Sequence, residues 1–243
     1  MKANIRSTLL VALVLFALAA SITIEVKVAV ADDDVVPAGA VAKSQSTAGD
    51  VDIDRSRVYA FVGKTGFGHE HGVVGRLKSG SIRLGARQKA GQLEFDLTSF
   101  VADTQEARRY VGLQGETDGS TQEQVTANML GKYVLDTQQY PTATFSIDSA
   151  LPLRGNLPNG AKRYQLDGQF TLHGATRPVR IVAQAQSESG VVRLRGAFTL
   201  LQTDYNITPF SKALGAVGVT DRLKIYGDIL IVATGNRPAA DQR

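Results

Sequence analysis

The sequence contains no cysteine and no tryptophan, and only three of its 243 residues are histidines. Without cysteine the chain has no disulfide, no thiolate zinc site, no iron–sulfur cluster and no cysteine nucleophile. It also lacks a Gly-x-y period, a long heptad repeat and a second long apolar run, which excludes a collagen, a coiled coil and a polytopic membrane protein. Hydrophobic residues make up 43% and charged residues 21% of the chain, which is ordinary for a globular protein.

The chain also has no large excess of either charge, because its 27 basic residues are nearly balanced by 23 acidic residues. Without residues 1–31, which contain Lys2, Arg6, Glu25 and Lys27, the chain keeps 24 basic and 22 acidic residues. A nucleic-acid-binding domain gathers lysine and arginine on one face. The near balance therefore predicts no nucleic-acid partner.

The N-terminal segment has the pattern of an export signal. Lys2 and Arg6 precede an unbroken apolar run at residues 9–20, and an Ala-x-Ala site ends at Ala31. This pattern predicts a cleavable signal peptide over residues 1–31 and a periplasmic or secreted protein. An uncleaved anchor is the alternative, although the apolar stretch is shorter than the ~20 residues that span a bilayer. The lack of cysteine suits a bacterial envelope protein better than a eukaryotic secreted one.

The remainder predicts one β-rich domain between two irregular segments. Residues 32–50 are rich in Ala, Ser, Gly and Asp without periodicity and predict a flexible linker, and residues 234–243 predict a disordered tail. Between them apolar and polar residues alternate in many short stretches, such as residues 93–97 and 143–147. Strands with one apolar face, joined by short turns, form antiparallel sandwiches or barrels.

One helical segment interrupts the strands. Residues 120–123 read Ser-Thr-Gln-Glu, the pattern of a capping box in which the serine caps the helix and the glutamate reaches back. Val125 and Met129 then follow on one face, and Gly131 marks the expected end.

Motifs for chemistry are few. His69 and His71 would share a face of a strand and could meet one metal ion, but a third ligand would have to come from the distant His173. We favour a polar glycine-rich turn over residues 66–72 and predict no metal site. The chain has no Gly-x-Ser-x-Gly, no His-Glu-x-x-His and no phosphate-binding glycine loop, so it is not expected to be an enzyme.

Five segments, in the same order, resemble motifs of the YceI-like family of bacterial lipid-binding domains. They are residues 51–58 (VDIDRSRV), 99–104 (SFVADT), 140–145 (YPTATF), 168–179 (GQFTLHGATRPV) and 204–207 (DYNI). The resemblance extends from about residue 51 to residue 233.

The chain also departs from the family pattern. Arg55, Ala60 and Asn206 stand where the family usually has His, Phe and Gly, and residues 68–72 and the helical segment at residues 105–128 are longer than usual.

The resemblance implies an all-β fold, an extended antiparallel lipocalin-like β-barrel of about eight strands with one inserted helical segment, over residues 51–233. The resemblance also implies an exported, non-enzymatic protein whose ligand is an isoprenoid-like amphiphilic lipid, such as a polyisoprenoid or a quinone-like lipid. No cofactor is expected besides this lipid. Peripheral contact with a membrane would accompany this role. One rival is an envelope interaction or stress protein with a solid barrel core and no ligand, and another is a metal protein or enzyme that uses the three histidines.

Alternation also predicts which apolar side chains point into such a barrel: Phe95, Phe145, Phe170, Leu172, Ile181, Leu194, Phe198 and Ile225. It leaves open whether each of these side chains contacts lipid or fills the core. His173, Arg177 and Tyr205 are the candidates for contact with a polar head group at the mouth.

Overall fold

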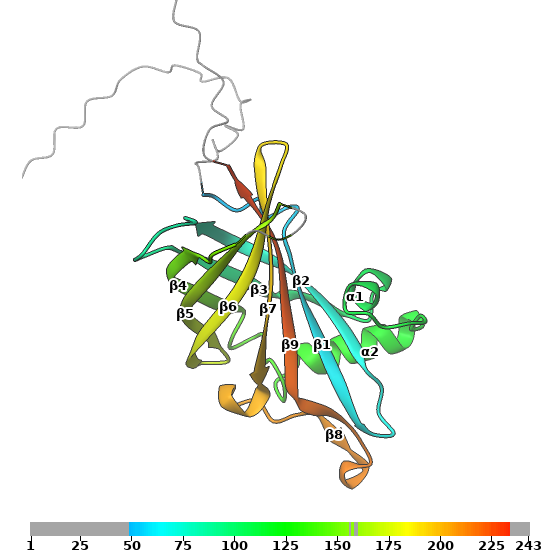
Figure 1. The fold of residues 1–243 in the computed structure, drawn as a ribbon. Coiled ribbons are helices and arrows are strands. Elements are labelled where there is room, and N and C mark those ends of the chain that lie inside the picture. The colour runs from blue at the N-terminus through cyan, green and yellow to red at the C-terminus, as the bar shows by residue number, and fades with distance from the viewer. Residues whose placement is uncertain (1–48, 156, 158–159, 234–243) are drawn as a thin grey trace, which may run out of the picture. The chain divides into compact units, whose positions relative to one another are not determined.

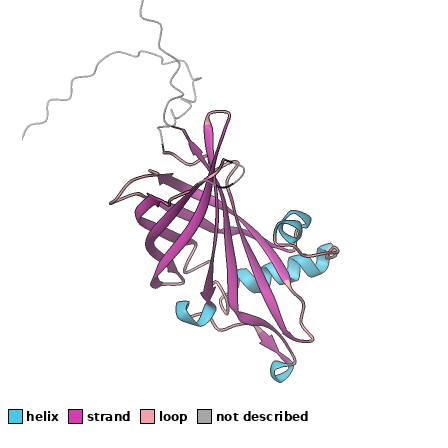
Figure 2. Ribbon diagram, in the orientation of Figure 1, coloured by secondary structure: helices cyan, strands magenta, loops and turns pink. Residues whose placement is uncertain are grey.

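The computed structural model describes residues 49–155, 157 and 160–233, and their elements follow the order expected of a β-barrel with a helical insertion (Figure 1). The elements are β1 (Arg57–Gly66), β2 (His71–Ile82), β3 (Gly91–Ala102), α1 (Gln105–Tyr110), α2 (Gly119–Leu130), β4 (Thr142–Pro152), β5 (Lys162–Leu172), β6 (Ala175–Glu188), β7 (Val191–Leu201), the 3₁₀ turn η1 (Gln202–Tyr205), β8 (Ser211–Lys212), the 3₁₀ turn η2 (Ala213–Gly215) and β9 (Val217–Val232). Strands dominate, and the helices lie outside the strand layer (Figure 2).

The strands form one antiparallel sheet that closes on itself. Neighbours along the chain pair from β1 to β7, β7 pairs with β9, and β9 pairs back with β1. Ala60 on β1 therefore has Val73 on one side and Ile225 on the other. The two-residue β8 adds to the end of β9 outside the ring. The result is a closed eight-stranded antiparallel barrel, which confirms the fold that the family resemblance implied.

Residue alternation gives the barrel its apolar interior. On β4, Ala143, Phe145 and Ile147 are buried, whereas Ser146 between them is exposed. One inward glycine is required by packing, because a Cβ at Gly168 would collide with the carbonyl oxygen of Ser146. Alternation thus separates the two faces of each strand, as the period of two demands.

The insertion between β3 and β4 consists of two helices on the outside of the barrel. In α1, Ala107 is fully buried and the ring of Tyr110 stacks on Tyr59 of β1, with 3.7 Å between the ring centroids. In α2, Val125 and Met129 pack against inner residues of β1, β2 and β3. The first helix fixes the insertion to the barrel wall, and the second helix helps to enclose the interior.

The start of α2 differs from the predicted capping box. Asp118 is the N-cap, and its carboxylate accepts a hydrogen bond from the backbone N–H of Thr121 at 3.0 Å. Ser120, the predicted cap, instead donates its hydroxyl to Asp118 at 2.7 Å. An aspartate is as good a cap as a serine, and the helix therefore starts two residues earlier than predicted, with the amide of Thr121 satisfied by the cap. The C-terminal boundary at Gly131 is confirmed.

The expected signal peptide, the tail and most of the expected linker lie outside the described residues. The last two linker residues are described and pair with the barrel. The amide of Gly49 donates to the carbonyl of Val232, and the amide of Val232 donates to the carbonyl of Asp50. Val51 forms a further bridge to Ile231 and is part of the core. The first barrel residues thus cover one end of the ring.

Candidate lipid cavity

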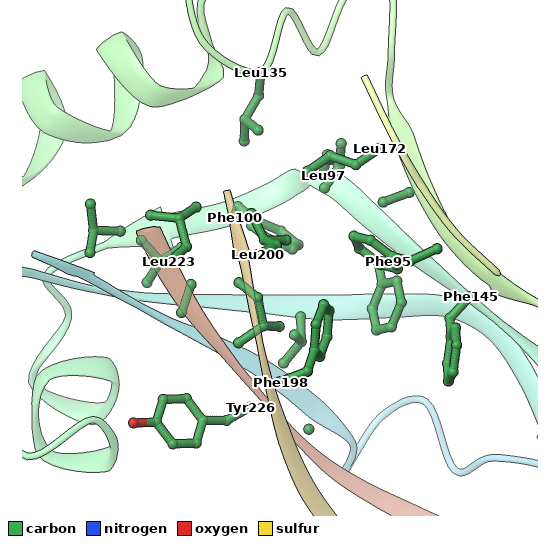
Figure 3. Close-up of a pocket in the computed structure, with 18 of the residues that line it drawn as sticks. Phe95, Leu97, Phe100, Leu135, Phe145, Leu172, Phe198, Leu200, Leu223 and Tyr226 are labelled. Carbon is green, nitrogen blue, oxygen red and sulfur yellow. The ribbon is translucent and has the colours of Figure 1, made fainter. Parts of the chain in front are cut away.

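A cavity of about 240 Å³ lies inside the barrel, and each of the eight barrel strands contributes to its wall; Figure 3 shows part of that lining. Its lining side chains are almost all apolar, and Phe95, Phe145 and Phe198 are seen within it in Figure 3. About 10–15 Å³ already admits a water molecule, so this volume is far beyond a packing defect. The barrel interior is hollow rather than filled by its own side chains.

A row of small residues explains where the hollow comes from. Ala183 on β6 pairs with Gly196 on β7, which in turn pairs with Gly227 on β9. All three line the cavity. Three adjacent strands therefore present almost no side-chain volume at one level of the barrel. Ile181 takes up the volume at Gly196, where a Cβ would lie 2.9 Å from its Cγ2, but a Cβ at Gly227 would have its nearest neighbour, Ile229, at 3.6 Å. Because eight strands enclose just enough room for their own side chains, the missing side chain at Gly227 leaves space for an apolar ligand.

The cavity opens at one end, which we call the mouth. Here its lining residues Val62, His71 and Phe210 are only partly buried, and Asn128 of α2 is exposed. At the opposite end Ile82, Phe145, Leu194 and Ile229 are buried. A ligand would therefore enter beside α2 and extend toward the closed end.

The structure brings together the eight apolar residues that alternation predicted to point inward. Each of them lines the cavity: Phe95, Phe145, Phe170, Leu172, Ile181, Leu194, Phe198 and Ile225. Phe170 lies at the centre of an aromatic cluster, with its ring edge-on to Phe198 at 5.4 Å and to Phe95 at 6.2 Å between centroids. The side chains thus form one continuous apolar wall rather than scattered contacts.

The three polar residues expected at the mouth do not line the cavity. His173 occupies the turn between β5 and β6 with a left-handed φ of 48°, and its ring lies 4.5 Å from that of Tyr140. Arg177 is exposed and donates to the carbonyl of Thr176 at 3.0 Å. Tyr205 is buried behind the wall, against Phe170. Its pKa is raised because burial and the charge of Asp204 outweigh the opposing charge of Arg177.

Sequence reasoning missed the polar side chains that do line the cavity, which include His71, Asn128 and Gln202. Gln202 is buried and donates to the carbonyl of Thr220 at 2.8 Å. A signal for His71 was present, because its position continues the inward alternation of Val73 and Leu77. The glycine-rich turn was expected to extend to residue 72, but β2 begins at His71.

His71 is held by a buried carboxylate. Its Nδ1 lies 2.6 Å from Oδ2 of Asp103, whose side chain is 2% exposed. The other carboxylate oxygen accepts from the backbone N–H of Gly72 at 3.1 Å and from Arg108 at 3.2 Å. Burial by itself raises the pKa of Asp103, but His71, Gly72 and Arg108 together hold that pKa below its ordinary value. The carboxylate is therefore ionised at neutral pH.

The described residues offer no assembled metal centre. Within residues 49–155, 157 and 160–233, no three His, Asp or Glu side chains are grouped so that they could hold an ion. His69 is exposed on the loop before β2, His71 is engaged by Asp103, and His173 lies on the β5–β6 turn. In the same part of the chain, no helix has both the length and the apolar character needed to cross a membrane.

Comparison with known proteins identifies the same domain type. The family model described as the YceI-like domain matches residues 40–230. Among solved structures, BcnA of Burkholderia cenocepacia matches with a TM-score of 0.52 and 18% identity over 75% of this chain and 100% of that one. A polyisoprenoid-binding domain from Saccharophagus degradans, implicated in plant cell wall breakdown, matches with a TM-score of 0.53 and 15% identity over 77% of this chain and 100% of that one. No curated protein matches the chain significantly.

Proposed function

The chain belongs to the YceI-like family, and from this membership we propose that it is an exported, non-enzymatic protein that holds an isoprenoid-like amphiphilic lipid inside its barrel. The observation that carries the proposal is the apolar cavity of about 240 Å³ inside the barrel, with partly exposed lining residues at one end. The similar structure from Saccharophagus degradans is described as polyisoprenoid-binding, which supports the same class of ligand.

The chemistry of the wall supports binding rather than catalysis. Among the described residues, no carboxylate, lysine, serine or threonine lines the cavity, so this lining contains nothing that resembles a nucleophile with its base. An apolar chain gains about 0.8 kcal/mol for each buried methylene, and four isoprene units would contribute well over 10 kcal/mol before the cost of ordering the lipid. Affinity for a long lipid therefore needs no covalent or charged group.

We propose that different inner side chains contact different parts of the lipid. Phe145 and Leu194 at the closed end would meet the terminal isoprene units, and Phe170 and Phe198 would pack along the middle of the chain. Ile225 on β9 is the register partner of Phe198 and would contact the same part of the chain. Such a wall recognises length and flexibility rather than a particular functional group.

The surface around the mouth supports contact with a membrane. Phe67, in the β1–β2 turn, is 86% exposed, and Leu214 in η2 is fully exposed. The amide of Phe67 donates to the carbonyl of Ala216, which places the two segments side by side. The exposed cations Lys64 and Lys212 flank them. Apolar side chains ringed by lysines are suited to the interface of an anionic bilayer, from which a lipid would pass into the cavity.

We also propose, from the export pattern at residues 1–31, that the protein is periplasmic or secreted after cleavage of a signal peptide, with an uncleaved anchor as the alternative.

The rival function, an envelope interaction or stress protein without ligand, requires a solid core. A cavity of about 240 Å³ would forgo on the order of 6 kcal/mol relative to a packed interior, at ~24 cal/mol per Å³. A bound ligand that fills the cavity would offset this loss of stability, whereas a protein without ligand would gain nothing from the empty space.

Native mass spectrometry of the protein purified from its own cells tests the proposal. The wild type should carry a lipid that organic solvent releases and that fragments into isoprene units. Phe198→Trp, which enlarges a side chain in the wall, should lose the lipid, whereas Thr199→Trp on the outer face should keep it. A wild-type protein that never carries or takes up an isoprenoid would instead favour the rival.

A further inference from the structure

The mouth contains one polar group whose position is fixed by buried charge. His71 is the first residue of β2, lines the cavity, and has a side chain that is only 16% exposed. Its Nδ1 lies 2.6 Å from the carboxylate of Asp103. Asp103 follows directly after β3 in a left-handed conformation, with φ 56°, which turns its side chain back toward the start of β2. The imidazole is therefore anchored rather than free to rotate.

The state of Asp103 determines which nitrogen of His71 carries the proton. An ionised carboxylate only accepts hydrogen bonds, so Nδ1 must be its donor. In the neutral imidazole the other nitrogen, Nε2, is then a hydrogen-bond acceptor. No partner for Nε2 is found among the described residues. An oriented acceptor thus lies at the mouth of a space whose wall is almost all apolar.

The neighbouring cation is not available to an anionic ligand. All three guanidinium nitrogens of Arg108 are engaged: Nη1 with Asp103, Nε with the carbonyl of Gly115 and Nη2 with the carbonyl of Gln114. Its charge balances that of Asp103, and Glu70 contributes only a backbone carbonyl to this cluster. Beside Nε2, a phosphate or carboxylate would meet an acceptor nitrogen and a guanidinium that is already engaged.

We propose that His71 is the head-group anchor of the cavity and that its Nε2 accepts a hydrogen bond from the hydroxyl of a lipid alcohol, such as an isoprenoid alcohol. The proposal rests on the function proposed above. It places the polar end of the lipid beside α2 and directs the apolar chain toward the buried wall formed by Phe145 and Leu194. A few positioned polar groups in an apolar pocket are the usual basis of orientation and selectivity.

The consequence is a preference among lipids with the same chain. Geranylgeraniol donates a hydroxyl hydrogen, its methyl ether does not, and geranylgeranyl phosphate carries an anion. The lipid-free wild type should bind the alcohol about three- to tenfold more tightly than the ether, the range expected for one hydrogen bond. The phosphate should bind less tightly than the alcohol, because Nε2 has no hydrogen to donate to it.

The binding experiment titrates these three lipids into the wild type, His71→Phe and His69→Phe, with His69 as the matched control because it is exposed on the adjacent loop. His71→Phe should bind alcohol and ether equally, at the affinity of the ether, while His69→Phe keeps the preference. Equal binding of alcohol and ether by the wild type, or a preference that survives in His71→Phe, would overturn the anchor and leave the carrier proposal intact. Failure of the wild type to bind any of the three would overturn both.

A second measurement does not depend on the folding of a variant. In ¹⁵N-histidine spectra of the wild type at neutral pH, His71 should be the Nδ1–H tautomer, and only its Nε2 resonance should shift when geranylgeraniol is added. His69→Phe and His173→Phe assign the three histidines. An Nε2–H tautomer, or an Nε2 signal that does not respond to the alcohol, contradicts the proposal.

Discussion

Replacing Gly227 with leucine should make the lipid-free protein more stable and at the same time expel its lipid. Gly227 lines the cavity, lies opposite Gly196 of β7, and has an extended conformation that any residue can adopt. A Cβ built there would have Ile229 as its nearest neighbour, at an ordinary contact distance of 3.6 Å. A larger side chain at this position therefore extends into space that the barrel already leaves open.

The magnitude follows from burial and backbone entropy. Burying a leucine side chain contributes about 1.5–3 kcal/mol, and removing a glycine from a strand interior restores roughly 0.5–1 kcal/mol. The lipid-free variant should then be more stable by about 2–4 kcal/mol, which raises Tm by at least ~4 °C for a domain of this size. The same leucine occupies the space in which the apolar chain of the lipid would lie.

The assay compares thermal unfolding of delipidated protein with the amount of isoprenoid that each variant carries when isolated from cells. Gly227→Ala is the graded control, since one methyl leaves most of the cavity open. Thr199→Leu adds the same side chain as the test variant but on the exposed outer face of β7. If Gly227→Leu unfolds at a lower temperature than the wild type, or carries lipid at the wild-type level, the placement of the cavity is wrong.

Three further predictions concern the anchor, the mouth and the N-terminus. Because the folded pKa of Asp103 lies below the ordinary 3.8, the ion pair of its carboxylate with Arg108 and its hydrogen bonds from His71 and Gly72 stabilise the protein above that pH and are lost as the pH falls through the folded pKa. Asp103→Asn should therefore cost about 3–5 kcal/mol at pH 7 by chemical denaturation, a deficit that narrows below pH 4. Phe67→Ser with Leu214→Ser should abolish co-sedimentation with anionic phosphatidylglycerol vesicles, whereas Ile53→Ser should not, and undiminished sedimentation of the double variant would refute a membrane-contacting mouth. Intact-mass measurement of protein from the producing cell should show a chain that starts near residue 32; a full-length mass in the membrane fraction would indicate an anchor.

Much of the fold could be predicted from local patterns. Strand alternation depends only on the period of two along an extended backbone, so residues such as Phe145 and Leu194 could be assigned to the inner face without any knowledge of their neighbours. The helical insertion was recognisable from its apolar spacing, because Val125 and Met129 share one helix face. Its N-cap was misplaced, since both Asp118 and Ser120 are good caps and the choice depends on where the preceding loop leaves the barrel.

Alternation gives the face of a strand but not the height of a residue along the barrel. Tyr205 and His173 were expected at the mouth, but neither lines the cavity: Tyr205 is buried behind the wall and His173 lies in the turn between β5 and β6. The height of a side chain depends on the register between strands, which is set by closure of the whole ring. Sequence patterns within a single strand carry no such information.

Local sequence patterns were enough to predict a β-rich domain, its apolar faces and its resemblance to a lipid-binding family. The hollow interior could be seen only in the folded barrel, because Ala183, Gly196 and Gly227 lie on three strands and form one region of small side chains only when those strands are paired. The fold also sets the role of His71, whose partner Asp103 lies 32 residues away in the chain. Cavities and buried ion pairs arise from residues that are distant in sequence, and closure of the barrel is what brings them within contact.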